Sequence, residues 1–437
     1  MSATLAAFLV FAGMFGALLA GMPLGFAMVG AGFLGCIFFI DLGAALSLLG
    51  QTTYESARSE AFVLIPLFML MGSFASRAGL SEDMFSAFNT WLGQRRGGLA
   101  LATIGACGAF AAVCGSSVAT AATITHVALP AMKKHKYNDG LSTGSIAAGG
   151  TLGILIPPSI VMVVYGLVTE TSVAELFLAG FIPGFLMIFL FMVTIAIIVR
   201  LDPTAGPAGD RSSFADKIVA LKNVWAMLSL FILVIGGIYT GVFTSEEAAG
   251  IGALGALIIA LISGRMTWGM FVECLMDTAQ TTAMILLIVI GAFMFKNFLL
   301  LSGLSAEVGK WVAGLPLPPL GILIVILAIY LFLGCVLDSI AIIFLTLPIF
   351  FPIIHNLGYD QVWFGILVVI VIEIGLITPP VGMNVFVIAT MALDIPLNTI
   401  FRGIWPFVAA QVVTLALIVA FPIIALWLPM TAQAWFR

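Results

Sequence analysis

Residues 149–166 read GGTLGILIPPSIVMVVYG, and residues 372–389 read IEIGLITPPVGMNVFVIA. Each stretch is strongly apolar, and each carries a glycine, three residues and then a Pro-Pro pair. The offset between the two copies is 222 residues, counted from Gly153 to Gly375. A Pro-Pro pair removes two consecutive backbone donors, and its rings clash with the preceding turn. Both stretches therefore predict a helix that is broken inside an apolar segment.

The same offset aligns further positions outside the two breaks. It pairs Ser116-Ser117 with Asp338-Ser339, Ala119 with Ala341, Pro130 with Pro352 and Tyr137 with Tyr359. Each copy runs from a small polar turn through an apolar stretch, a proline and a tyrosine to Gly-x-x-x-Pro-Pro. Duplicated segments with interrupted apolar helices are the best sequence indication of a secondary transporter's binding site.

The composition identifies an integral membrane protein. Hydrophobic residues make up 62% of the chain and charged residues only 8%, whereas soluble domains carry roughly 25% charged residues. Apolar runs long enough to cross about 30 Å of hydrocarbon recur along the whole chain.

Charge and reactive residues argue against several other classes of function. The net charge of −4 and the absence of a basic cluster argue against a nucleic-acid partner. The five cysteines are scattered without a C-x-x-C motif, and the three histidines have no zinc or haem spacing. We therefore predict neither an enzyme nor an organic cofactor.

The apolar segments predict an all-α fold with many membrane spans. Two segments, 97–132 and 319–354, are too long for one span, and each has a polar kink, at residues 114–117 and 334–339. We interpret both as re-entrant hairpins, because non-helical backbone at membrane depth must be buried in protein or line a wet cavity. The other expected spans are 4–20, 22–40, 61–77, 140–168, 178–199, 222–243, 246–264, 283–301, 361–391 and 404–428.

The duplication predicts two repeats joined by a linker. The first repeat is 1–200, with hairpin 97–132 and broken helix 140–168. The second is 222–437, with hairpin 319–354 and broken helix 361–391. Residues 201–221 between them are rich in Gly, Pro, Ser and Asp. Segments 41–60 and 265–283 are less apolar, and we expect them to be amphipathic helices lying along the membrane interface.

Lysine and arginine residues predict the orientation of the repeats. Hairpin one is flanked by Arg95, Arg96, Lys133, Lys134 and Lys136, whereas the second exit of hairpin two has no basic residue. Because positive residues mark the cytoplasmic side, we expect hairpin one to open from the cytoplasm and hairpin two from outside. Five crossings per repeat then make the repeats inverted, with a cytoplasmic linker and both chain ends outside.

The two breaks leave backbone carbonyls, at residues 149–156 and 373–378, without helical partners. Each such group costs several kcal/mol in hydrocarbon, so a sodium ion, a neighbouring helix or water must satisfy it. The hairpin tips offer oxygen atoms from Ser116, Ser117, Asp338 and Ser339. The helix N-termini beyond the tips suit a carboxylate or sulfonate. The alternatives are purely structural proline kinks, and serines that bond back to the preceding turn.

Four further polar residues lie within the predicted spans. Asp338 and Glu373 are functional candidates beside the second break, because ionisable residues inside membranes are usually functional. Asn384 lies one turn after Pro380, where its amide suits a substrate oxygen or an interhelical hydrogen bond. Lys296 would face a substrate carboxylate, pair with an acid or snorkel to the interface.

At these residues the chain resembles a known family. GSSVATAATI, LPAMKKHKY, GGTLGILIPPS, LDSIAIIFLTLPIFFPI and EIGLITPPVGMN are similar to the large membrane subunit of tripartite ATP-independent periplasmic (TRAP) transporters. The similarity covers nearly the whole chain. It implies an elevator-type transporter of the ion transporter superfamily, in which a domain carrying both hairpins and both broken helices slides against a scaffold.

The resemblance also implies sodium coupling through two sites. The first carries over to Gly115, Ser116, Ser117, Gly153 and Pro157, and the second to Gly334, Asp338, Gly375, Thr378 and Met383.

For the substrate we predict contacts with Ser116, Ser339, Asn384 and Lys296. The implied partners are a periplasmic substrate-binding protein and a small four-helix membrane subunit. We expect that subunit to be a separate polypeptide, because Met1 leads directly into the large subunit.

We therefore predict the permease of a sodium-coupled, binding-protein-dependent transporter in the bacterial inner membrane. Its substrate would be a small organic anion such as a dicarboxylate, sugar acid or sulfonate. The alternative is a stand-alone sodium–carboxylate symporter with similar hairpins, which would need neither the small subunit nor the binding protein.

Overall fold

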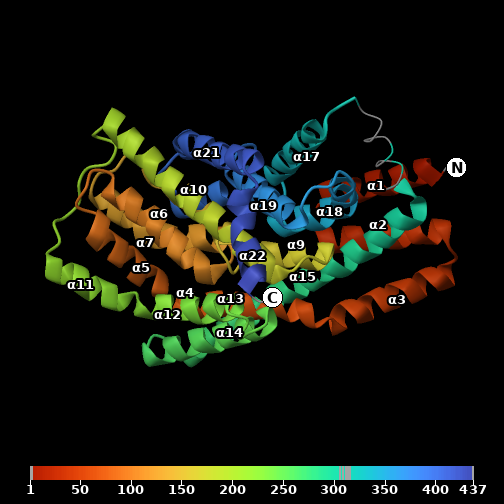
Figure 1. Cartoon of the computed structure of the whole chain (residues 1–437), viewed down its shortest axis with the longest axis horizontal. Coiled ribbons are helices and arrows are strands. Elements are labelled where there is room, and N and C mark those ends of the chain that lie inside the picture. Colours follow the sequence, from red (N-terminus) through yellow and green to blue (C-terminus); the bar gives the residue numbers. More distant parts are fainter. Residues whose placement is uncertain (1–2, 305–306, 308–309, 311–315, 436–437) are drawn as a thin grey trace.

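The computed structural model describes residues 3–304, 307, 310 and 316–435. Within these residues every regular element is a helix, which confirms the predicted all-α class. Figure 1 shows an elongated molecule with α9 (Ile160–Thr169) and α19 (Gln361–Ile377) near its middle. The hairpin of α6 (Gly98–Cys114) and α7 (Ser117–Lys134) lies to one side of them, and α17 (Pro319–Gly334) and α18 (Ser339–Asn356) lie to the other.

The remaining helices complete the two halves of the chain. The first half also contains α1 (Ala3–Leu19), α2 (Leu24–Phe39), α3 (Leu42–Arg58), η1 (Glu60–Val63), α4 (Leu64–Arg77), α5 (Leu80–Leu92), α8 (Asp139–Leu155) and α10 (Val173–Leu201). The second half also contains α11 (Phe214–Asn223), α12 (Trp225–Phe231), the π-helical η2 (Ile232–Gly236), α13 (Gly237–Tyr239), α14 (Ser245–Ile262), α15 (Trp268–Ser302), α20 (Met383–Met391), α21 (Leu397–Ala420) and α22 (Ile423–Trp435).

Helices recur along the chain at the sequence offset of the two motifs. α2 corresponds to α14, α6 to α17, α7 to α18, α8 to α19, α9 to α20 and α10 to α21. The packing is reciprocal, because α2 lies against α15 while α14 lies against α4, and α7 contacts α20 while α18 contacts α9. In these pairs, equivalent helices of the two halves therefore contact the opposite half in the same way.

Small residues allow α2 and α15 to approach closely. A Cβ atom built on Gly32 would lie 2.7 Å from the backbone of Met294 and Phe295, and one built on Gly291 would lie 2.9 Å from the carbonyl oxygen of Gly25. Larger side chains at these points would push the two helices apart. Small residues at close helix contacts are typical of membrane proteins, where lipid is as apolar as the helix surface.

Both broken helices are interrupted where the proline pairs lie. α8 ends at Leu155 and α9 begins at Ile160, while α19 ends at Ile377 and α20 begins at Met383. Proline lacks the N–H that would continue the helical hydrogen-bond pattern. After the first break Ser159 restarts the helix, because its hydroxyl accepts a hydrogen bond from the N–H of Met162 at 3.3 Å.

The prediction of a separate interfacial helix at 265–283 is wrong. These residues enter α15, which runs without a break through the span predicted at 283–301. Residues 270–290 contain neither glycine nor proline, and Glu273 forms an ion pair with Arg77 of α4 at 3.1 Å. The corresponding segment 41–60 does form a separate helix, α3.

Two other predicted boundaries differ from the structure. The span predicted at 404–428 is divided into α21 and α22 at Pro422, because a proline disfavours helical backbone at the residue before it. Helical structure begins before the span predicted at 222–243, since a capping box of Ser213 and Asp216 starts α11 within the predicted linker 201–221. Helix α5 occupies a segment for which the sequence suggested no element.

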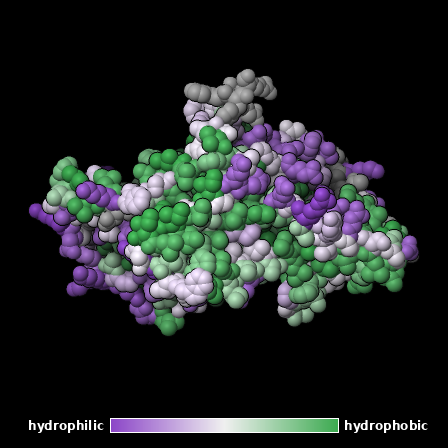
Figure 2. Space-filling view, turned by 90° about the horizontal axis from the view of Figure 1, so that it is seen from below, coloured by the Kyte–Doolittle hydropathy of each residue, from purple (hydrophilic) through white to green (hydrophobic). Residues whose placement is uncertain are grey.

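The chain is a multi-pass membrane protein. Seven helices among the described residues are long and apolar enough to cross a bilayer, and a bent pair over residues 214–239 would make eight. Figure 2 shows broad hydrophobic areas across one face, with hydrophilic residues at its left end and in a patch at its upper right. This distribution suits a surface that lies mostly in hydrocarbon.

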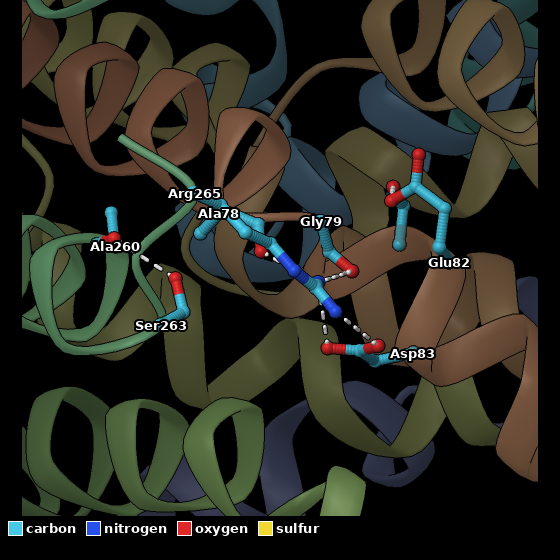
Figure 3. A network of polar contacts seen from close by, with 8 residues as sticks. Ala78, Gly79, Glu82, Asp83, Ala260, Ser263 and Arg265 are labelled. Carbon is cyan, nitrogen blue, oxygen red and sulfur yellow. Dashed lines mark hydrogen bonds and ion pairs between the residues drawn. The ribbon is translucent and has the colours of Figure 1, made fainter. Parts of the chain in front are cut away.

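A polar network joins the two halves at the turn between α4 and α5 (Figure 3). Arg265, which precedes α15, donates to the carbonyl oxygen of Ala78 at 2.9 Å and to both carboxylate oxygens of Asp83 at 3.1 and 3.2 Å. Gly79 has a φ of +75°, and a Cβ atom there would collide with the Arg265 guanidinium. Arg265 thus binds Asp83 in a bidentate contact that holds the start of α15 against α5, the helix that precedes hairpin one.

Candidate functional site

The first hairpin turns at Gly115 and meets the first break there. Gly115 has a φ of +65°, and a Cβ atom on it would lie 2.9 Å from the carbonyl oxygen of Pro158. Its own carbonyl accepts from the N–H of Ile160 at 3.4 Å. Both the left-handed backbone and the close contact favour glycine. The hairpin tip is thereby joined to the backbone on the far side of the break.

Gly153 joins the same tip to the near side of the break. A Cβ atom on Gly153 would lie 2.5 Å from the carbonyl oxygen of Ser116 and 2.8 Å from the Thr120 hydroxyl. The Ser116 hydroxyl caps α7 by accepting from the N–H of Ala119 at 3.4 Å. Ser116 therefore acts as an N-cap rather than bonding back to the preceding turn.

The second hairpin meets the second break in the same way. A Cβ atom on Gly375 would lie 2.5 Å from the carbonyl carbon of Gly334. The N–H of Val381 donates to the carbonyl of Cys335 at 3.2 Å, as that of Ile160 does to Gly115 in the first half. Asp338 caps α18, its Oδ2 accepting from the N–H of Ile340 at 3.1 Å. Asp338 thus caps its helix, and its carboxylate still has oxygen lone pairs for a cation.

The two breaks differ in exposure. Pro157 and Pro158 are buried, whereas Pro379 and Pro380 are exposed. Thr378 and Met383, on either side of the second pair, are half-buried. In this conformation the second break is open at its proline pair while the first is enclosed by protein.

The oxygen atoms at the two breaks form a hard ligand set. The Thr378 hydroxyl donates to the carbonyl of Ile374 at 2.6 Å, so its lone pairs remain available. Hydroxyls and main-chain carbonyls, with the carboxylate of Asp338, suit an alkali cation better than a transition metal. Among the described residues no group of three or more His, Cys, Asp and Glu side chains could hold a metal ion.

Glu373 connects the two constellations. The Ser117 hydroxyl donates to Glu373 Oε1 at 2.6 Å, although the two residues are 256 apart in the chain. Glu373 is fully buried, and its Oε2 has no hydrogen-bond partner among the described residues. The sequence assigned Glu373 to the second constellation, but its side chain reaches the tip of hairpin one. Serine back-bonding, the alternative for Ser117, does not occur.

Asn384 is an unpaired amide in the first turn of α20. It is fully buried, and neither its Oδ1 nor its Nδ2 has a hydrogen-bond partner within the described part of the chain. The interhelical hydrogen bond that the sequence left open is therefore absent there. A buried amide without partners is costly, and a bound polar ligand would satisfy it. Ser339 is also buried, at the start of α18.

Lys296 lies in a different environment from the hairpin tips. It is half-buried on α15 and lines two cavities, of about 310 and 270 Å³. Their walls come from α3, η1, α9, α15 and α18, and include Glu55 in one cavity and Glu170 in the other. Ser116, Ser339 and Asn384 line neither cavity. Within the described residues Lys296 forms no ion pair, so the pairing with an acid is not made in this conformation.

Sequence reasoning missed one polar pair near the first break. Gln411 of α21 donates through Nε2 to the Thr151 hydroxyl of α8 at 2.9 Å, and both residues are fully buried. The signal was present, because Gln411 and Thr151 are polar residues inside apolar segments, but nothing in the sequence indicates that they meet.

Comparison with known proteins identifies the family. Residues 11–424 match the family model described as "Tripartite ATP-independent periplasmic transporter, DctM component". The chain is 38% identical to the C4-dicarboxylate TRAP transporter large permease DctM of Pseudomonas aeruginosa, over 86% of this chain and 88% of that protein. It is 32% identical to the sialic acid TRAP transporter large permease SiaM of Vibrio cholerae, over 95% and 97%.

A solved structure supports the fold alone. The crystal structure of the Alcanivorax borkumensis YdaH transporter superposes with a TM-score of 0.65 and covers 90% of each chain at 16% sequence identity. With the family match, these findings place the protein among the membrane permeases. The chain belongs to the TRAP transporter family, as a large permease subunit of the DctM type. Its relatives are transporter subunits and not enzymes, as predicted.

Proposed function

We propose that this protein is the permease of a sodium-coupled, binding-protein-dependent importer of a small organic anion, in the bacterial inner membrane. The observation that carries the proposal is that the glycine of each break lies against the backbone at the turn of its own hairpin. Gly153 lies against Ser116 and Gly375 against Gly334, both at backbone-contact distance. Two similar constellations of main-chain carbonyls and hydroxyls suit two sodium ions.

The first sodium site would use oxygen atoms of Gly115, Ser116, Ser117, Gly153 and Pro157. The second would use Gly334, Asp338, Gly375, Thr378 and Met383. Asp338 lies at the N-terminus of α18, where the helix dipole already favours negative charge. A carboxylate held there by its own helix is ready to attract a cation. The sodium ions would therefore bind beside the hairpin tips.

The substrate would bind between the same tips. Asn384 offers donors and an acceptor that lack partners in the described residues, while Ser116 and Ser339 stand at the N-termini of α7 and α18. Helix N-termini favour anions. Lys296 lies apart from this group, so its contact with substrate would require a different position of the hairpins relative to α15.

The relatives indicate the class of substrate. They are named for C4-dicarboxylates, sialic acid, isethionate and ectoine. The first three are organic anions, and the DctM relative of Pseudomonas aeruginosa is 38% identical to this chain. A C4-dicarboxylate is therefore the substrate to test first. Membership in a tripartite family favours dependence on a binding protein and a small membrane subunit over a stand-alone symporter.

The proposed transport movement is an elevator. Its moving part would comprise the hairpins α6–α7 and α17–α18 with the broken helices α8–α9 and α19–α20. Repeats 1–200 and 222–437, joined through 201–221, would be inverted relative to each other. The reciprocal packing of the two halves supports this arrangement.

The function is tested by reconstitution. The permease and a small membrane subunit are reconstituted into proteoliposomes, and a binding protein encoded beside them is added outside. Uptake of labelled succinate, sialic acid and isethionate is then measured. We expect uptake of one of them under an inward sodium gradient, and none under a matched potassium gradient. Uptake that persists without the binding protein would instead identify a stand-alone symporter.

Inverted repeats predict that Lys134 and Asn356 lie on opposite sides of the membrane. The two residues occupy equivalent positions at the ends of α7 and α18, and both are exposed. Cysteines introduced there, in a background without the five buried native cysteines, should react with an impermeant maleimide from opposite sides. Labelling of both from one side would contradict the inversion.

Thr378→Ala should weaken the sodium dependence of uptake. The change removes a hydroxyl oxygen from the proposed second site, and losing one ligand of about 1–3 kcal/mol corresponds to a roughly ten- to hundredfold loss of affinity. The measurement is the half-saturating sodium concentration for uptake. Thr346→Ala is a matched control, because Thr346 makes the same bond to a carbonyl four residues earlier outside the proposed sites.

A further inference from the structure

Both broken helices carry a polar residue two positions before the glycine of the break. Thr151 precedes Gly153 on α8, and Glu373 precedes Gly375 on α19. The two polar residues are equivalent under the repeat offset, and both are fully buried. A polar side chain at this depth must find a partner inside the protein, so each of the two residues is expected to make a hydrogen bond to another part of the chain.

Each of these residues bonds across to the other half of the chain. Glu373 accepts from Ser117 of α7 at 2.6 Å, and Thr151 accepts from Gln411 of α21 at 2.9 Å. The partners are 256 and 260 residues apart in sequence. The two equivalent positions thus both bond across the halves, but to helices that are not equivalent, α7 and α21, and only the bond to Ser117 ends at a residue of the proposed sodium sites.

The Ser117–Glu373 bond changes what the Ser117 hydroxyl can do. Other hydroxyls on α7 donate to a carbonyl four residues earlier, as Thr120 does to Ser116 and Thr125 to Ala121. Ser117 is the first residue of α7, so it has no such carbonyl in its own helix. Its hydroxyl donates to Glu373 instead, and this bond holds the Ser117 oxygen toward α19.

We propose that Glu373 is a positioning residue that holds the Ser117 hydroxyl at the first sodium site and thereby makes the two sites cooperative. The inference rests on the proposed sodium sites. Glu373 belongs to α19, the helix whose end forms the second site at Gly375 and Thr378. A movement of α19 on binding sodium there would reach the first site directly, through one buried hydrogen bond.

The test is a sodium titration of the purified full chain with its small subunit, by equilibrium binding of ²²Na⁺. Glu373→Leu removes the acceptor, whereas Glu373→Gln keeps an amide oxygen that Ser117 can donate to. We expect Glu373→Leu to raise the half-saturating sodium concentration about tenfold and to lower the Hill coefficient toward one. Glu373→Gln should restore both values to near those of the wild type.

Thr151→Val is the matched control, because it removes the cross-half bond made at the equivalent position of the first half and does not change a proposed ligand. It should leave the sodium titration unchanged. In the double variant Ser117→Ala/Glu373→Leu, the loss should be no larger than in Ser117→Ala alone, since one bond is removed in both cases. Should Glu373→Leu fail to purify as a single species, Glu373→Met replaces it with a side chain closer in shape.

Several results would overturn the inference. If the fold-losses of sodium affinity in the two single variants multiply in the double variant, Glu373 does not act through Ser117. Equal losses in Glu373→Gln and Glu373→Leu would make the carboxylate a direct ligand instead of a positioning group. Two wild-type sodium sites with an unchanged Glu373→Leu titration would remove the inference alone, whereas a wild type without saturable sodium binding would remove the proposed function as well.

Discussion

Asp338→Asn is expected to abolish sodium-driven uptake while leaving the protein folded and inserted in the membrane. Asp338 caps α18 through Oδ2, and asparagine is about as good an N-cap as aspartate. The substitution therefore preserves the helix start and removes only the negative charge. That charge is what we propose the second sodium site uses, and what Ser116 at the equivalent position of hairpin one does not supply.

The measurement is uptake in proteoliposomes, together with size-exclusion behaviour and thermal stability of the purified variant. Asp360→Asn is the matched control, because Asp360 caps α19 by accepting from the N–H of Trp363 at 2.8 Å and is not a proposed ligand. Both variants should be about as stable as the wild type. Near-normal uptake by Asp338→Asn would reject the coupling role and leave Asp338 as a cap only.

Gly375→Ala is expected to disrupt the second site by displacing hairpin two from the break. The added Cβ would lie 2.5 Å from the carbonyl carbon of Gly334 and 2.9 Å from the backbone nitrogen of Cys335. Backbone atoms cannot rotate away as side chains do, so the hairpin tip must move. Overpacking of this kind typically costs about 1–3 kcal/mol, and the displaced ligands should abolish uptake.

Thermal unfolding and uptake of Gly375→Ala are compared with those of Gly50→Ala. Gly50 lies on α3, and a Cβ atom there would meet nothing within 4 Å. Because alanine is the better helix former, Gly50→Ala should be at least as stable as the wild type. A Gly375→Ala protein with unchanged stability and uptake would show that the contact between Gly375 and Gly334 is not needed.

The contacts at the two breaks suggest why both halves of the chain are needed for one site. Hairpin one supplies Ser117, but its hydroxyl is held by Glu373 of α19. The second half of α8 is in turn held by Gln411 of α21 through Thr151. Each broken helix is therefore held in part by a hydrogen bond to the other half of the chain.

Much of the fold followed from local chemistry. Proline cannot donate a hydrogen bond, so the breaks at Pro157-Pro158 and Pro379-Pro380 were predictable wherever the rest of the chain lay. Glycine with a small polar residue, as in Gly115-Ser116, predicted the hairpin turn for a similarly local reason. The continuous α15 also has a local reason that the sequence prediction overlooked, because residues 270–290 contain neither glycine nor proline to interrupt a helix.

The sequence by itself determined a helical membrane protein with a duplicated, proline-broken core, because hydrophobic content and backbone donors are properties of the residues themselves. It also identified Asp338 and Glu373 as functional candidates inside apolar segments, and left Asn384 open between a substrate contact and an interhelical hydrogen bond. Only the tertiary structure decided that Glu373 meets Ser117, that Asn384 finds no partner in the described residues and that Lys296 lies apart in cavities of its own. Side chains hundreds of residues apart meet only when whole helices pack, and the spacing of residues along the chain does not encode that packing locally.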